Sequence, residues 1–144
     1  MKILSPAFED GSAIPDEYTC KGADISPELS FQDVPAEAKS LVLIMDDPDA
    51  PMGTWDHWVV FNIPVSVTKI DKGTEPEGVA GTNSWKKTGY GGPCPPSGTH
   101  RYFFKLYALD EMLDLSEGAT KAEVQKAMDN HIIEEAQLMG KYSK

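Results

Sequence analysis

The sequence predicts a mainly β protein, an antiparallel sandwich of two sheets with a few short helices at its margins. Three observations favour this class: several short apolar runs rich in β-branched and aromatic residues, turn residues spread along the whole chain, and only one clear helical pattern. With 12 glycines and 11 prolines in 144 residues, the chain is rich in turn formers. No repeat or linker divides it, so residues 1–144 are predicted to form one domain.

Three runs are predicted to be strands. The run 40–45 is short, apolar and β-rich, as expected of a buried central strand, and it ends at Asp46-Asp47-Pro48. The run 57–63 is closed by Pro64, and the run 100–109 has the strongest strand pattern in the chain. A turn-rich stretch with many glycines separates the second run from the third.

One helix is predicted near the C-terminus. Thr120 followed by Glu123 is the pattern of a capping box, and Val124, Ala127 and Met128 follow at helical spacing. The tail beyond His131 is ambiguous, because it could continue the helix or form a closing strand.

Charge and apolar patterning restrict the partners. A net charge of −10 argues against nucleic acid and anionic membranes, which need a basic surface. No apolar run approaches the length of a membrane span, and the opening residues lack the pattern of a signal peptide, so we expect a cytoplasmic protein. Free thiols are then favoured for Cys20 and Cys94, with one long-range disulfide as the alternative.

The strand pattern brings polar residues to one rim of a sheet. Alternation places His57 on the same face as Val59, Phe61 and Ile63 of the second strand, and it places His100 on the face that carries Tyr102, Phe104, Leu106 and Ala108. If the first two strands pair antiparallel, Asp47 at the end of one lies beside His57 at the start of the other. His100 joins them if the third strand begins at that rim.

Such a cluster suits a small anion. A carboxylate near two imidazoles raises their pKa values, and partly cationic imidazoles beside the N–H groups of the glycine-rich turn at 89–98 form a receptor for phosphate, sulfate or carboxylate. Arg101 alternates to the opposite face, which favours a structural ion pair.

Other interpretations of the same residues remain open. Each histidine could be a hydrogen-bonded edge residue, and Asp47 and Asp49 could be ordinary turn residues. The trio Asp47, His57 and His100 could hold zinc, although no closely spaced ligand pair forms the site in advance. Acid–base catalysis is chemically possible, but no nucleophile is evident unless it is Cys94. No cofactor motif is present, since the glycine-rich run lacks the third glycine of a dinucleotide loop.

Several motifs in order resemble the phosphatidylethanolamine-binding protein family, in particular its short bacterial and archaeal branch, often labelled Raf-kinase-inhibitor-like. They cover nearly the whole chain, at the positions 22–27, Asp47-Pro-Asp-Ala-Pro51, Trp55-Asp-His57, Gly92-Pro93 and His100-Arg-Tyr102. The resemblance implies a two-sheet β-sandwich with a small anion pocket at one end. It also implies an extended tail after His131 and a cis bond at Ala50–Pro51.

By motif matching, the resemblance assigns roles in that pocket. Asp47 would be its acid, His57 and His100 its histidines and Tyr102 a lining hydroxyl. Gly92 and Pro93 would form the lip of the pocket, and Asp49 and Trp55 would support it. The chain differs from the larger eukaryotic form at Asp56, where a histidine often stands, at Cys94, where proline is common, and in lacking the extended C-terminal helix.

The resemblance also implies a range of functions, because members bind phosphate-like head groups and short anions, and some modulate kinases or inhibit serine proteases. We therefore expect a non-enzymatic protein that binds a phosphate-bearing small molecule or a phosphorylated partner, without a metal or a cofactor. The alternatives are an inhibitor of a kinase or protease acting through a surface loop such as 73–92, and a small hydrolase using the histidine–aspartate cluster. A homodimer is plausible from the family.

Overall fold

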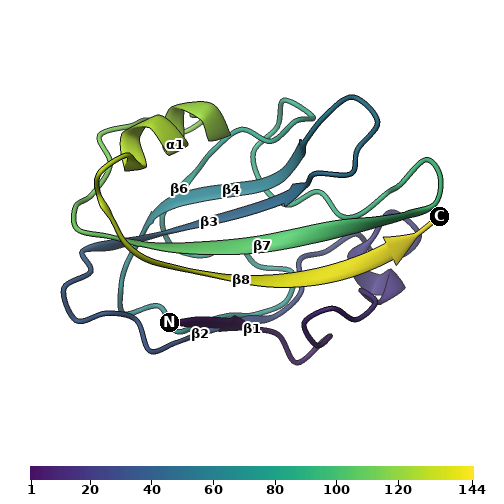
Figure 1. The fold of residues 1–144 in the computed structure, drawn as a ribbon, viewed down its shortest axis with the longest axis horizontal. Helices are drawn as coiled ribbons and strands as arrows, with labels where there is room; N and C mark the ends of the chain where they lie inside the picture. The colour runs from purple at the N-terminus through teal and green to yellow at the C-terminus, as the bar shows by residue number, and fades with distance from the viewer.

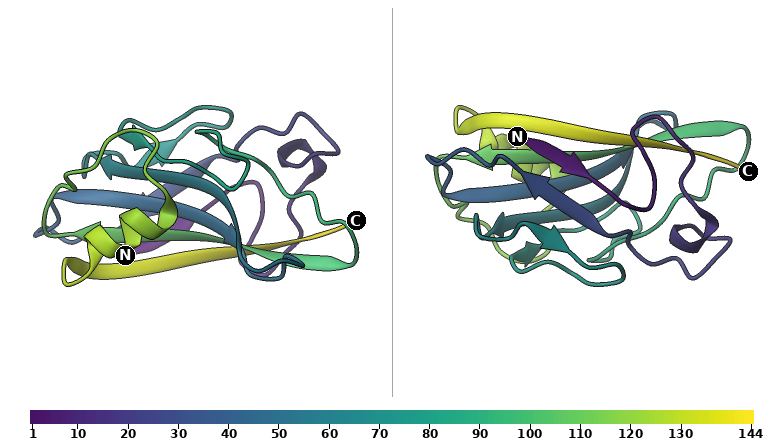
Figure 2. Two further views of the ribbon diagram at one scale, coloured as in Figure 1. Left: turned by 90° about the horizontal axis from the view of Figure 1, so that it is seen from above. Right: turned by 90° about the horizontal axis from the view of Figure 1, so that it is seen from below.

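The computed structural model describes residues 1–144 and confirms the predicted two-sheet architecture. The smaller sheet has the order β1-β2-β5, and the larger one β6-β4-β3-β7-β8, all antiparallel. In Figure 1 the smaller sheet lies below the larger one and the single α-helix lies above it, and Figure 2 shows the same layers from above and below. The elements in chain order are β1 Lys2–Leu4, a 3-10 turn Asp16–Tyr18, β2 Leu29–Gln32, β3 Ser40–Asp47, β4 Trp55–Ile63, β5 Lys69–Ile70, β6 Val79–Ala80, β7 Thr99–Leu109, α1 Lys121–Met128 and β8 Ile132–Ser143.

The centre of the larger sheet is buried on both faces, which explains why β3 is apolar without alternation. Its inner face packs on the smaller sheet through one cluster that includes Leu43, Met45, Phe104 and Leu106. Its outer face packs on α1 through a second, smaller cluster around Val42 and Ile44. Every residue of β3 is buried, as predicted for a central strand.

The helix and the tail agree with the sequence patterns. Thr120 caps α1 with a complete capping box to Glu123. The tail after His131 is the long strand β8, which pairs with β7 along its whole length. The extended tail that the resemblance implied is therefore confirmed, whereas the local pattern had left both helix and strand open. No helix in the structure is long and apolar enough to cross a bilayer.

Two expectations about covalent geometry are wrong. Cys20 and Cys94, which are 74 residues apart, form a disulfide instead of two free thiols, because the turns that carry them lie side by side and the N–H of Cys20 donates to the carbonyl of Pro93. The peptide bond Ala50–Pro51 is trans, like all others in the chain. Pro51 sits in a turn closed by a hydrogen bond from the N–H of Gly53 to the carbonyl of Ala50, a place where trans-proline is common.

Candidate functional site

A bulge in β4 turns His57 toward the inner face of the larger sheet. Met45 pairs with Trp58 but the next residue, Asp46, pairs with Asp56, so His57 is an extra residue with no partner on β3. A bulge re-aims the side chain at its centre. The ring of His57 consequently packs edge-on against Tyr102, at 5.3 Å between centroids.

The prediction that His57 shares one face of the second strand with Val59, Phe61 and Ile63 is therefore wrong. A second bulge near Asn62, which has a positive φ of 53°, moves Ile63 to the inner face as well. Val59 and Phe61 face the helix, opposite to His57. Strict alternation fails here because each extra residue reverses the faces of everything beyond it.

The pairing of β3 with β7 brings His100 to Asp47. The two strands are antiparallel, so the start of β7 lies at the end of β3, where His100 Nδ1 and Asp47 Oδ2 are 2.7 Å apart. The second oxygen of Asp47 accepts the N–H of Asp49. Both carboxylate oxygens are thus occupied, and the histidine ring is fixed through one nitrogen.

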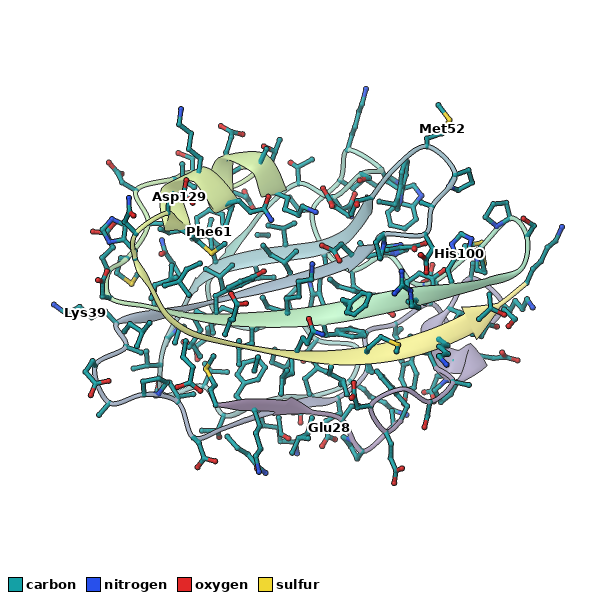
Figure 3. All side chains as sticks on the ribbon, in the orientation of Figure 1. Glu28, Lys39, Met52, Phe61, His100 and Asp129 are labelled. Carbon is teal, nitrogen blue, oxygen red and sulfur yellow. A yellow bond between two sulfur atoms is a disulfide. The ribbon has the colours of Figure 1, made fainter.

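Asp47, His57, His100 and Tyr102 meet in one pocket of about 390 Å³. Figure 3 labels His100 at the end of the molecule that also carries the exposed loop of Met52, far from Lys39. The floor of the pocket is polar, whereas its rim is apolar and aromatic. The full lining is Asp47, Ala50, Pro51, Met52, Trp55, His57, Trp85, Cys94, Pro95, Pro96, His100 and Tyr102.

Three polar atoms in this pocket have no hydrogen-bond partner in the protein. His57 Nδ1 lies 2.7 Å from the carbonyl of Gly91, which can only accept, so Nδ1 carries the proton and Nε2 is free. His100 is held in the same way by Asp47. The Nε2 atoms and the Tyr102 hydroxyl are not among the buried polar atoms without a partner, so each reaches solvent.

His57 does not have the raised pKa that the sequence predicted. Burial lowers the pKa of His57, and this effect outweighs the hydrogen bond to Gly91 and the carboxylates of Asp47, Asp46 and Asp56, which raise it. His57 is therefore neutral at pH 7, and its Nε2 is an acceptor until it gains a proton. Burial and the nearby Asp47 raise the pKa of Tyr102, so its hydroxyl stays a donor.

Of the other residues predicted for the site, one lines the pocket, one lies beside it and two are buried behind its wall. Trp55 lines the pocket. Asp49 lies beside it and binds Arg101 through the backbone N–H and two guanidinium nitrogens, the structural ion pair expected of Arg101. This pairing lowers the pKa of Asp49 to about 2. Gly92 and Pro93 are buried behind the wall that Cys94, Pro95 and Pro96 form.

The sequence did not single out Trp85 or the two prolines after Cys94 as pocket residues. Trp85 packs edge-on against both Trp55 and His57. It is placed there by Asn83, whose side chain accepts the N–H of Trp85. An asparagine two residues earlier is a turn signal, but nothing local shows that the turn faces His57.

Gly92 explains why the wall comes so close to the N-terminal turns. Its N–H donates to Asp24 Oδ1, and an added Cβ would lie 2.2 Å from the carbonyl oxygen of Tyr18. Together with the disulfide, this close approach fixes the wall of the pocket to residues 18–24.

Fold and site together define a class of β-sandwich proteins in which the larger sheet ends in a small polar pocket with an aromatic rim. The family model described as phosphatidylethanolamine-binding protein matches residues 4–143. The chain belongs to this family, as the resemblance of its motifs predicted.

Relatives and solved structures agree over the full chain. A UPF0098 protein of Methanothermobacter thermautotrophicus is 54% identical, over 99% of this chain and 98% of its own length. The crystal structure of a phosphatidylethanolamine-binding protein homologue from Chlamydia trachomatis superposes with a TM-score of 0.96 at 49% identity, covering 99% of this chain and 97% of that one. Escherichia coli YbcL, described as a member of the mammalian family, gives 0.92 at 30% identity, over 99% and 98% of the chains.

Proposed function

We propose that the protein binds small anions of the phosphate class in this pocket and does not transform them. The observation that carries the proposal is the set of three unpaired polar atoms: Nε2 of His57, Nε2 of His100 and the hydroxyl of Tyr102. The Tyr102 hydroxyl is a donor, and each Nε2 becomes one when its ring is protonated, so the three atoms together suit a tetrahedral oxyanion, which offers several acceptor oxygens.

Proton uptake is part of the proposed binding. Because His57 is neutral and buried, its Nε2 can donate to an anion only after the ring gains a proton. The bound anion supplies the charge that makes this protonation favourable. The ligand is either a phosphate-bearing small molecule or a phosphorylated side chain, since both present the same oxygens.

The geometry argues against the alternatives from sequence. The hydrolase hypothesis used the histidine–aspartate cluster with Cys94 or a metal as a possible addition, and the disulfide leaves no thiol at Cys94. The two oxygens of Asp47 accept hydrogen bonds from His100 Nδ1 and from the backbone N–H of Asp49, so Asp47 does not face a shared metal with both histidines. The inhibitor hypothesis stays a prediction, although part of segment 73–92 is pinned to β4 by bonds from Gly81 N–H to Val59 and from Gly91 N–H to His57.

Calorimetric titration with inorganic phosphate and sulfate tests the proposal. His57→Ala and His100→Ala are each expected to lower affinity by about tenfold or more, the scale of one hydrogen bond to a charged group. His131→Ala is the matched control, because this third histidine pairs with Asp110 and Glu111 outside the pocket. Equal affinity in folded pocket variants and wild type would remove the proposal.

A further inference from the structure

A buried group of charges lies behind the sheet, directly opposite the pocket. Asp46 of β3 and Asp56 of β4 are partners in the strand register. Asp46 is only 2% exposed, and a carboxylate so deeply buried is unfavourable unless it is paired. Lys121, the first residue of α1, supplies the pair: its Nζ lies 2.9 Å from Asp56 Oδ1 and 3.2 Å from Asp46 Oδ2.

The position of Lys121 is unfavourable on local grounds. The N-terminal turn of a helix carries partial positive charge, which repels a cation. Burial alone would also lower the pKa of Lys121, yet the contacts with Asp56 and Asp46 outweigh it and the pKa is raised. The two carboxylates therefore stabilise the Lys121 cation against both the positive end of the helix and its burial.

Those two carboxylates flank the bulge that aims His57. Asp56 directly precedes His57, and its backbone is bound to Ser84 by two hydrogen bonds, one from its own N–H to Ser84 Oγ and one from the N–H of Ser84 to its carbonyl. The side chain of Asp56 has no hydrogen-bond partner at Oδ1, and its one ion pair is with Lys121. If Asp56 left the back face, the strand could regain simple alternation and His57 would turn away from the pocket.

We propose that Lys121 is a positioning residue for the pocket, which pairs with Asp46 and Asp56 behind the sheet and so holds the bulge that turns His57 inward. Nothing in the pocket touches Lys121, so it acts entirely through the sheet.

The charges around His57 determine in which direction its pKa changes when Lys121 is removed. Asp47 of β3 lies on the pocket side of the sheet and Asp46 and Asp56 lie behind it, and each of the three carboxylates raises the pKa of His57. His100 and Tyr102 of β7 complete the surroundings, with Tyr102 protonated. Removing Lys121 leaves Asp56 without a cation, leaves Asp46 with Lys105 alone, and lets water reach the loosened bulge. These effects raise the pKa of His57.

NMR titration of the His57 ring in Lys121→Met tests the proposal. We expect a higher His57 pKa than in wild type, loss of the protected Nδ1–H resonance, and sulfate affinity lower by about tenfold, the scale of one lost hydrogen bond between His57 and the anion. Lys121→Arg keeps the cation and is expected to restore all three. Lys105→Met is the matched control, because Lys105 also lies 3.2 Å from Asp46 Oδ2 but does not reach Asp56.

A folded Lys121→Met variant with an unchanged His57 pKa and resonance would overturn the proposal, as would an equal shift in Lys105→Met. If Lys121→Met does not fold, Asp56→Ala tests the same contact, because it leaves Asp46 and Lys121 paired. The Nδ1–H resonance of His57 is then expected to disappear, and its survival would overturn the proposal. The affinity readout alone rests on the proposed function: if wild type binds no sulfate, that function fails while the ring measurements still decide the role of Lys121.

Discussion

Asp47 and His100, 53 residues apart in sequence, are joined by a hydrogen bond of 2.7 Å that is nearly closed to solvent. An ionised carboxylate can only accept, so the proton lies on Nδ1 of the histidine. Gly91 fixes the ring of His57 in the same tautomer. The protein thus presents two imidazoles through the same atom, Nε2, toward one pocket, and this shared orientation underlies the predictions about binding.

Tyr102→Phe separates ligand binding from stability. The hydroxyl has no partner in the protein although the residue is 1% exposed, so its removal deletes no internal hydrogen bond. We expect the free energy of unfolding to stay within about 0.5 kcal/mol of wild type. Sulfate affinity should fall by about tenfold, since a hydrogen bond to a charged group is lost. Urea unfolding and calorimetry measure the two quantities, and a variant that is strongly destabilised or binds as well as wild type would contradict this.

The lowered pKa of His57 predicts how binding depends on pH. Above its pKa the free protein holds a neutral ring, and anion binding must bring in a proton. Affinity should therefore rise as pH falls from 8 toward 5 and should level off below the pKa of free His57, which lies under the ordinary histidine value of about 6.5. Sulfate is the appropriate probe because it does not itself titrate in this range.

Calorimetry in buffers of different ionisation enthalpy counts the protons taken up with sulfate. His57→Gln, which keeps a polar side chain that does not titrate, should show smaller uptake and a flatter pH profile than wild type. Affinity that is constant from pH 5 to 8, or that rises with pH, would show that a neutral His57 suffices.

The sequence predicted the parts of the site that depend on local patterning and missed those that depend on distant contacts. Alternation placed His100 correctly, because β7 is regular along the segment from Thr99 to Leu109. It misplaced His57, because an extra residue in a strand leaves no trace in hydropathy. The raised pKa expected for His57 was wrong because burial outweighs the carboxylates, and burial is a property of the assembled fold. Trp85 and the disulfide depend on turns that meet only in three dimensions.

The disulfide is expected to stabilise both the fold and the pocket. Cys94 lines the pocket, and its bond to Cys20 closes a loop with a sequence separation of 74 residues. Reduction should lower the free energy of unfolding by up to about 4.5 kcal/mol, the chain-entropy value for a loop of this length. Sulfate affinity should also fall, because the wall of Cys94, Pro95 and Pro96 loses its link to the N-terminal turns.

Urea unfolding and sulfate titration with and without dithiothreitol test this prediction. The double variant Cys20→Ser with Cys94→Ser should match the reduced wild-type protein and should not respond to the reductant. Identical unfolding curves and affinities for oxidised and reduced protein would show that the backbone contacts around Gly92 hold the wall unaided.

Asn62 is expected to set the register of β4 beyond Phe61. It occupies the left-handed region at a φ of 53°, and its side chain both donates to the carbonyl of Leu113 and accepts the N–H of Leu113. Asn62→Gly keeps the backbone conformation and loses the two hydrogen bonds, which should cost about 1–3 kcal/mol. Asn62→Ala loses the same bonds and adds about 1 kcal/mol or more of backbone strain. The difference in free energy of unfolding between the two variants, measured by urea unfolding, gives the backbone strain of alanine at this positive φ. An alanine variant as stable as the glycine variant would mean that the bulge had moved to another residue.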